Sequence, residues 1–394
     1  MRAVSRRAGA TAILLAAGLL VLPAGVASGK GGHAPSGHNG KPKLKVIATG
    51  LNNPRGITVA DGKVYVAESG RGGSSCQGEG EDQQCFGTTG AVTRISHHGQ
   101  RRVVRNLPSV AGPDGTGATG PSDVSVRDGK LYITVGNQGG PETRAPFGPA
   151  GAALGRLVKA KHGGVRFVAD LATFEKNNNP DKGAAAQPGL SIDSNPQAVL
   201  ALDDKQLVVD AAGNDLLKVD HKGRISVVAV FPTHVIPTPP EAGLPPTFEA
   251  QPVPTSIVKG PDGAYYVGEL TGFPFTPGQS RIWRIKPGHK PKVYKTGFTN
   301  VIDLAFDKQG RLLVLTIAAK GLLQAEGPGG DFTGLLTRVE RNGKRTVLAK
   351  EGLVAPTGIA VDRKDGAIYI SNYGVFPGSG PTPPGTGQVV RLKP

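Results

Sequence analysis

The sequence predicts an all-β protein, a six-bladed β-propeller. One unit occurs six times: a Pro or Asn, a short apolar strand, a turn that usually contains Asp-Gly, and a second strand rich in Tyr, Val and Ile. A strand-turn-strand unit that is repeated along the chain is typical of propeller blades. The 59 Gly and 33 Pro residues fit a fold of short strands and many turns. We take as equivalent positions Gly56, Asp123, Ala198, Ser256, Ile302 and Gly358.

Two further strands follow the first five copies. The third strands begin at Ala91, Gly155, Asp215, Arg281 and Gly334, and the fourth at Arg101, Val165, Ile225, Pro291 and Arg345. The sixth copy ends after a third strand at Gln388, while an extra strand, 44–51, precedes the first copy. We expect this N-terminal strand to complete the last blade of a domain spanning 44–394, because closure removes an open sheet edge.

The loops differ in length between the two ends of the predicted blades. Turns between first and second strands, and between third and fourth, are tight, as at Asp61-Gly62. Every long insertion joins second to third strands or one blade to the next: 70–90, 108–120, 138–154, 172–194, 232–252, 318–333 and 374–387. Long loops at one end of a rigid scaffold often carry binding. The alternative is tolerated surface decoration.

Polar side chains should surround the channel mouth at this end. The second strands end there and the first strands begin there, with Gln197 and Thr316 among the polar residues. The alternative is that a water-filled channel tolerates polar side chains. We predict a ligand-binding site formed by Arg55, Glu68, Asp123, Asn137, Asp210, Asn214, Glu269, Asp303 and Asn372. In it, Arg55 could bind an anionic group, and Glu68, Asp210 and Glu269 could hold Ca²⁺.

The N-terminus predicts export. Arg2, Arg6 and Arg7 precede the apolar stretch 8–22, and small residues follow, so 1–27 has the features of a signal peptide. The apolar stretch is shorter than the roughly 20 residues of a membrane anchor. Residues 28–43 should form a flexible spacer. The export route, general or twin-arginine, stays open.

The two cysteines, Cys76 and Cys85, lie within one hydrophilic insertion. In an exported chain such a pair predicts a disulfide that closes a small loop. The alternative, a reactive thiol or metal ligand, lacks neighbours that would support it.

Histidines and motifs argue against most enzyme classes. His97, His98, His162, His221 and His289 fall at turns away from the insertions, and only His234 is expected at the insertion end. The chain has no GxSxG, HExxH or Gly-rich phosphate loop, so hydrolase, metalloprotease and nucleotide-binding functions lack support. A mechanism that uses carboxylates alone remains open.

The basic charge has two interpretations. Without Arg2, Arg6, Arg7, Lys30, Lys41, Lys43 and Lys45, 39 basic and 30 acidic residues remain, so the formal charge falls from +16 to +9. Basic residues on outer strands guard sheet edges, or they form an anionic ligand site. Either would attract the chain to an acidic cell envelope. Nucleic acid is not an expected partner, because few aromatic residues accompany the basic ones.

Several segments resemble one family. LKVIATGLNNPRGITVADGKVYVAESGRGG, CFGTTGAVTRI, GPSDV and PTGIAVDRKDGAIYISNYG closely resemble the exported ScyD/ScyE proteins, whose founders belong to a cyanobacterial sunscreen-pigment cluster. The resemblance runs from about Leu44 to the end of the chain. It implies a six-bladed propeller related to NHL and lactonase-type propellers, and it transfers no catalytic residue.

Two functional hypotheses follow. The first is a secreted, monomeric binding or scaffold protein without a transmembrane segment, whose ligand is a small molecule or a component of the cell envelope. The second is a Ca²⁺-dependent enzyme of the lactonase or sugar-dehydrogenase type, for which the mouth offers carboxylates but no convincing base. The sequence favours the first.

Overall fold

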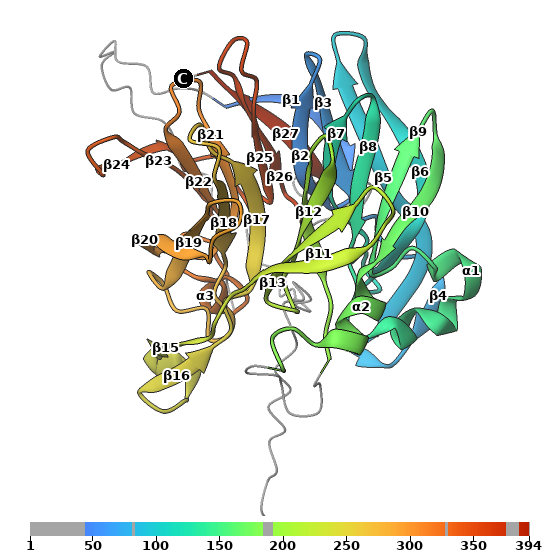
Figure 1. Cartoon of the computed structure of the whole chain (residues 1–394), viewed down its shortest axis with the longest axis horizontal. Coiled ribbons are helices and arrows are strands. Elements are labelled where there is room, and N and C mark those ends of the chain that lie inside the picture. The colour runs from blue at the N-terminus through green and yellow to red at the C-terminus, as the bar shows by residue number, and fades with distance from the viewer. Residues whose placement is uncertain (1–43, 81–82, 184–191, 328–329, 376–385, 394) are drawn as a thin grey trace, which may run out of the picture.

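The computed structural model describes residues 44–80, 83–183, 192–327, 330–375 and 386–393. The predicted signal peptide, 1–27, and spacer, 28–43, lie outside these residues. Within them, six antiparallel sheets form the blades of a propeller (Figure 1), which confirms the predicted fold class. The first strands contact one another in chain order, and the last contacts the first, so the ring is closed.

The first three blades are continuous in sequence. Blade 1 contains β2 (Pro54–Ala60), β3 (Lys63–Glu68), β5 (Gln84–Ser96) and β6 (Gly99–Ala111), with the short β4 (Ser75–Gln77) added beside β5. Blade 2 contains β7 (Pro121–Arg127), β8 (Lys130–Val135), β9 (Arg156–Lys161) and β10 (Gly164–Asp170). Blade 3 contains β11 (Pro196–Ala201), β12 (Lys205–Asp210), β13 (Asp215–Asp220) and β14 (Ile225–Val230).

The last blade combines both ends of the described chain. Blade 4 contains β17 (Pro254–Lys259), β18 (Tyr265–Glu269), β19 (Ser280–Ile285) and β20 (Lys292–Phe298). Blade 5 contains β21 (Val301–Phe306), β22 (Leu312–Thr316), β23 (Leu335–Val339) and β24 (Arg345–Ala349). Blade 6 contains β25 (Gly358–Val361), β26 (Ile368–Asn372), β27 (Gly387–Leu392) and β1 (Lys45–Leu51), so the predicted closure is confirmed.

The ladder registers correct one position of the repeat. Pro254 lies opposite Glu269 and Val301 opposite Thr316, each at the start of a first strand and followed by a bulge. Asp303, not Ile302, therefore corresponds to Ser256. The fifth copy has Val301 where the others have proline, and this hid the alignment. Asp123 and Asp303 are thus equivalent residues of blades 2 and 5, which lie across the ring from each other.

Hydroxyl groups join the inner strands of neighbouring blades. Ser122 Oγ donates to the Pro196 carbonyl over 2.6 Å, and Thr255 and Thr357 make the same bond to Val301 and Pro54 over 2.9 and 2.6 Å. The accepting carbonyl groups belong to the innermost strand of each blade, and no strand lies further inside to donate to them. The hydroxyl groups satisfy them instead. Further from the axis apolar faces pack together, as where the rings of Phe231 and Trp283 lie 5.5 Å apart between blades 3 and 4.

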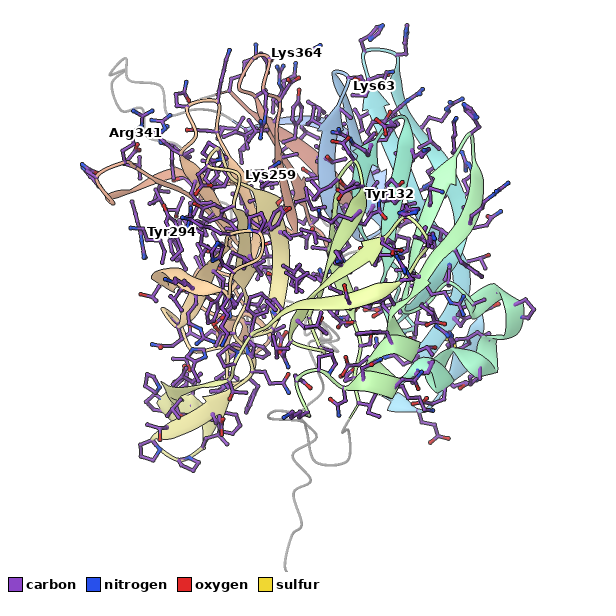
Figure 2. All side chains as sticks on the ribbon, viewed as in Figure 1. Lys63, Tyr132, Lys259, Tyr294, Arg341 and Lys364 are labelled. Atoms are coloured by element: carbon purple, nitrogen blue, oxygen red, sulfur yellow. A yellow bond between two sulfur atoms is a disulfide. The ribbon has the colours of Figure 1, made fainter. Side chains whose placement is uncertain are left out.

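The described parts of the insertions gather at one end of the ring, the lower end in Figure 1. The tight turns lie at the other end, where Figure 2 shows Lys63, Arg341 and Lys364. Throughout the described ranges, no helix is long and apolar enough to cross a membrane. The insertion end carries β4, η2 (Pro141–Phe147), α1 (Gly148–Gly151), α2 (Leu171–Asn178), the hairpin of β15 (His234–Pro237) and β16 (Thr247–Ala250), η3 (Pro240–Ala242) and α3 (Leu322–Ala325).

The predicted disulfide is present. Cys76 and Cys85 lie opposite each other on β4 and β5, with their Cα atoms 3.9 Å apart. The bond closes a loop with a sequence separation of only 9 residues. The rest of β5 pairs with β3 and β6 independently of it.

We expect the double variant Cys76→Ser, Cys85→Ser to keep the propeller fold. A loop this short restricts the unfolded chain by about 2 to 3 kcal/mol, a modest part of the stability of a large domain. Far-UV circular dichroism should be unchanged, and proteolysis should increase only within 70–90. Loss of the cooperative thermal transition would contradict this local role.

Candidate functional site

A cavity of about 70 Å³ opens at the insertion-end mouth of the channel. Its two sides differ in chemistry. Blades 1 to 3 contribute a polar side that includes Arg55, Ser69 and Gln197. Blades 4 and 5 with α3 contribute an apolar side formed by Val253, Leu270, Ile302, Ile317 and Leu322.

Arg55 places a positive charge on the polar side. As the second residue of β2 it reaches inward, where Nε donates to Ser69 Oγ over 3.2 Å and Nη2 donates to the Ala118 carbonyl over 2.8 Å. Ser69 Oγ in turn donates to the Pro121 carbonyl, which fixes it as the acceptor for Arg55. Burial lowers the pKa of Arg55 to about 10, so the guanidinium stays charged at neutral pH.

No carboxylate compensates this charge in the described structure, because Arg55 takes part in none of its ion pairs. Its Nη1 group also makes no hydrogen bond to the described residues, unlike Nε and Nη2. The two anchoring bonds hold the guanidinium in place, and Nη1 is left as a donor for a ligand.

Asp123 in blade 2 and Asp303 in blade 5 lie one residue beyond the strand position that corresponds to Arg55. Their side chains lie within the channel. Asp123 accepts from Val199 N over 2.8 Å and Asp303 from Ile359 N over 2.7 Å, so each joins its blade to the next. Burial raises the pKa of Asp123 to about 7. Burial raises the pKa of Asp303 well above its usual value, and the charge of Asp123 adds to this.

Gly56 of blade 1 packs directly against the side chain of Asp123. A Cβ on Gly56 would lie 1.9 Å from Asp123 Oδ1, so only glycine fits at that position of blade 1. We infer that these two aspartates hold the inner ring together, while Arg55 faces the mouth above them.

Glu68 points outward into blade 1. It is completely buried and accepts from Thr93 Oγ1 over 2.6 Å and from the Asn52 backbone N–H over 2.8 Å. Arg102 on β6 adds a two-pronged ion pair, with Nε–Oε1 and Nη2–Oε2 distances of 3.0 and 2.7 Å. All of these partners belong to the blade and the connection that leads into it.

Glu269 has the same role in blade 4. It is completely buried and accepts from Arg281 Nε over 2.7 Å and Trp283 Nε1 over 2.8 Å. Burial raises its pKa to about 7, against the opposing effect of Arg281. His234, the histidine expected at this end, lies beside it with Nε2 4.0 Å from Glu269 Oε1.

Asp210 holds the connection into blade 3. It accepts from Ser194 Oγ over 2.6 Å and from the backbone N–H groups of Asn195 and Gly213 over 2.7 and 3.0 Å. Three separate blades therefore hold Glu68, Asp210 and Glu269, each with its own donors. The structure does not bring them together, and among the described residues no group of three or more His, Cys, Asp or Glu is placed to hold a metal.

The predicted asparagines also hold connections. Asn372 Oδ1 accepts from Val354 N over 2.7 Å, and Asn214 Oδ1 accepts from Val253 N over 3.3 Å. Asn137 Nδ2 donates to the Gly139 carbonyl over 2.8 Å. From the predicted set, then, the cavity at the mouth contains Arg55, and the channel next to it contains Asp123 and Asp303.

A cluster of carboxylates beside α2 was not predicted. Glu175, Asp181 and Asp193, all from the insertion 172–194, lie near Asp210 and Asp215 of blade 3, and each raises the pKa of a neighbour. Burial and this repulsion raise the pKa of Glu175 to about 8 and that of Asp215 well above its usual value. Neither carboxyl oxygen of Asp215 has a hydrogen-bond partner among the described residues.

The cluster predicts that stability falls as the pH rises from mildly acidic values to about 8. The pKa of Glu175 rises from an ordinary 4.5 to about 8 on folding, so the free energy of unfolding falls as the pH rises between these values. Glu175→Gln replaces the titratable carboxyl with a neutral amide and should raise the Tm at pH 8.5 by about 2 to 4 °C, with little change at pH 5. The exposed Glu142, whose pKa is lowered by Lys176, is the control, since Glu142→Gln should not raise the Tm. Parallel pH profiles for parent and Glu175→Gln would contradict the coupling.

Solved structures share this architecture. A protein of unknown function from Bacteroides thetaiotaomicron is 9% identical, with 89% of this chain and 75% of that chain covered and a TM-score of 0.50. A putative oxidoreductase (glucose dehydrogenase) from Thermus thermophilus is 18% identical, with 89% and 99% covered and the same TM-score of 0.50. A streptogramin B lyase is 13% identical, with 89% and 97% covered and a TM-score of 0.46.

The two neighbours with a TM-score of 0.50 show the six-bladed propeller fold and nothing more specific, because their identities are low. No protein-family model matches the chain, and no curated protein matches it either.

Proposed function

We propose that this chain is a secreted binding protein of the ScyD/ScyE type, which holds a small organic anion at the insertion-end mouth of its channel. The observation that carries the proposal is Arg55, an anchored guanidinium with no carboxylate partner at the edge of a cavity. An uncompensated charge inside a protein is costly unless a ligand satisfies it.

The lining indicates the kind of anion. The side opposite Arg55 is apolar, with Leu270 and Ile302 among its residues. The cavity has a volume of about 70 Å³ and opens at the mouth, so it can receive the charged end of a small anion whose apolar part extends along the mouth. We therefore expect an amphipathic ligand with its charged group on Arg55 and its apolar part against blades 4 and 5.

The mouth favours binding over catalysis. A general base must reach the substrate, whereas neither Asp123 nor Asp303 is among the residues that line the mouth cavity, and both accept from backbone N–H groups of neighbouring strands. His234 lies beside Glu269 in blade 4 and does not line the mouth cavity.

Titration calorimetry with benzoate, phenyl phosphate and acetate tests the proposal. We expect the two aromatic anions to bind the parent protein more tightly than acetate. Arg55→Met keeps much of the side-chain length and removes the charge, so it should weaken binding by about 30-fold, the equivalent of a charged hydrogen bond of roughly 2 kcal/mol. Lys63→Met, at the opposite end, is the control (Figure 2). Equal affinities for parent and Arg55→Met would rule out this site.

A further inference from the structure

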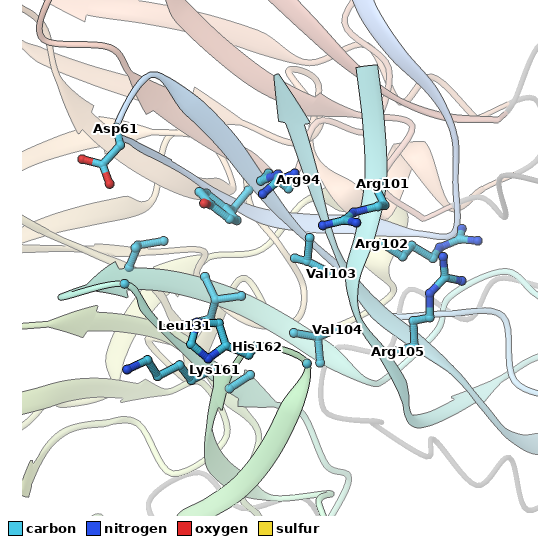
Figure 3. Close-up of a pocket in the computed structure, with 15 residues that line it drawn as sticks. Asp61, Arg94, Arg101, Arg102, Val103, Val104, Arg105, Leu131, Lys161 and His162 are labelled. Atoms are coloured by element: carbon cyan, nitrogen blue, oxygen red, sulfur yellow. The ribbon is translucent and has the colours of Figure 1, made fainter. Parts of the chain in front are cut away.

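A second basic feature lies on the outside of the ring, between blades 1 and 2. A groove of about 600 Å³ runs between β5 and β6 of blade 1 and β8 and β9 of blade 2 (Figure 3). We call it the basic groove and define it by Arg94, Arg101, Arg105, Lys161 and His162, which line it. We propose that the basic groove binds a linear acidic polysaccharide.

The cations of the groove are not neutralised by the protein. Arg102 also lines the groove, but its guanidinium forms an ion pair with Glu68. Arg94, Arg101, Arg105 and Lys161 take part in none of the ion pairs formed within the described ranges. Arg94 Nε is in addition buried without a hydrogen-bond partner among the described residues.

The corresponding positions of the other blades differ in their ion pairs. Each third strand carries a basic residue near its end. In blades 4 and 6 this residue pairs with the aspartate of the Asp-Gly turn, as Arg284 does with Asp262 and Arg391 with Asp365. Blade 1 has both members, Arg94 and Asp61, yet the two form no ion pair, and Figure 3 shows Asp61 at the edge of the groove.

Ligand binding and protection of sheet edges make different demands on these charges. Protection requires only that outer strands carry charge, and paired charges serve that purpose. The basic groove instead concentrates unpaired positive charge between two blades, where negative ligands are attracted.

The shape of the surface indicates a polymer. A second hollow of about 400 Å³ adjoins the groove and shares Lys161 and His162 with it. It adds Lys130, Lys159 and Arg166, so the positive path continues around blade 2. One phosphate or carboxylate would contact a small part of this path, whereas a chain with regularly spaced acidic groups could follow it.

The lining favours a polysaccharide over a nucleic acid. Single-stranded nucleic acids bind through aromatic side chains that stack on their bases. Tyr65 is the one Phe, Tyr or Trp among the described residues that line the groove, and the floor of the groove is aliphatic, with Val104 and Leu131. Recognition would therefore depend on charge, and salt should weaken it strongly.

Fluorescence anisotropy with labelled heparin, a linear sulfated polysaccharide, tests the proposal on the chain from Leu44 onward. The triple variant Arg94→Gln, Arg101→Gln, Arg105→Gln should bind at least about tenfold more weakly than the parent. The control, Lys286→Gln, Lys290→Gln, Lys292→Gln, makes the same change in net charge at exposed positions of blade 4 and should lose less than about twofold. Thermal melts verify that both variants are folded.

Three outcomes would overturn the proposal: no heparin binding by the parent, equal losses in the two triple variants, or equally tight binding of a single-stranded oligonucleotide of matched charge. Arg55→Met should leave heparin affinity unchanged, since Arg55 lies in the channel and not in the groove. Failure at the channel mouth and failure at the groove can therefore be told apart.

Discussion

Deletion of residues 44–51 is expected to leave no folded monomer. These residues form β1, which supplies the outer strand of blade 6 and buries Ala48 and Leu51. Without β1 the long edge of β27 would be open to pairing with other chains. The truncated protein should therefore unfold or elute as oligomers in size-exclusion chromatography, with no cooperative thermal transition at the Tm of the parent.

A chain that begins at Leu44 is the matched control, because it keeps β1. It should retain the Tm and elution volume of the chain that begins at Ser28. A stable monomer lacking 44–51 would show that the closing strand is not needed, and that the interfaces between blades alone hold the ring.

Glu68→Gln is expected to lower stability by about 2 to 4 kcal/mol, because it removes the charge that balances Arg102 inside blade 1. Glutamine keeps the shape of the side chain but offers one acceptor oxygen where the carboxylate uses two. Denaturant unfolding measures the effect. Glu241→Gln on the exposed connection of the β15–β16 hairpin is the control and should change stability by less than about 0.5 kcal/mol.

The same variant tests the idea of a metal held by Glu68, Asp210 and Glu269. Since their oxygens are engaged by protein donors in three blades, Ca²⁺ and a chelator should give the same Tm for the parent protein. A Ca²⁺-dependent rise in Tm that disappears in Glu68→Gln would instead support the metal site.

The fold could be predicted because its signals are local and repeated. Alternating apolar strands and tight turns define the blades, and the extra N-terminal strand matches the missing fourth strand of blade 6. The directions of polar side chains could not be predicted in this way. Glu68 and Arg55 both lie where strands meet the mouth, yet the side chain of Glu68 turns away from it toward Arg102. The position of Arg102 depends on the pairing of β5 with β6, and the register of that pairing contains several bulges.

The cluster of carboxylates beside α2 could not be predicted from the sequence, for a different reason. Glu175 reaches blade 3 only because α2 folds back over it, and no repeat governs the path of an insertion. The single break in the repeat had a similar effect, since Val301 in place of proline shifted the alignment by one residue and concealed the equivalence of Asp123 and Asp303.

The proposed binding of an anionic group by Arg55 at the channel mouth is tested most directly by a crystal structure of the protein with 4-iodobenzoate, in which anomalous scattering locates the iodine. We predict the carboxylate within hydrogen-bond distance of Arg55 Nη1 and the iodine beside the apolar side formed by Leu270 and Ile302. An anion bound elsewhere, with the mouth containing only water at saturating ligand, would contradict the account.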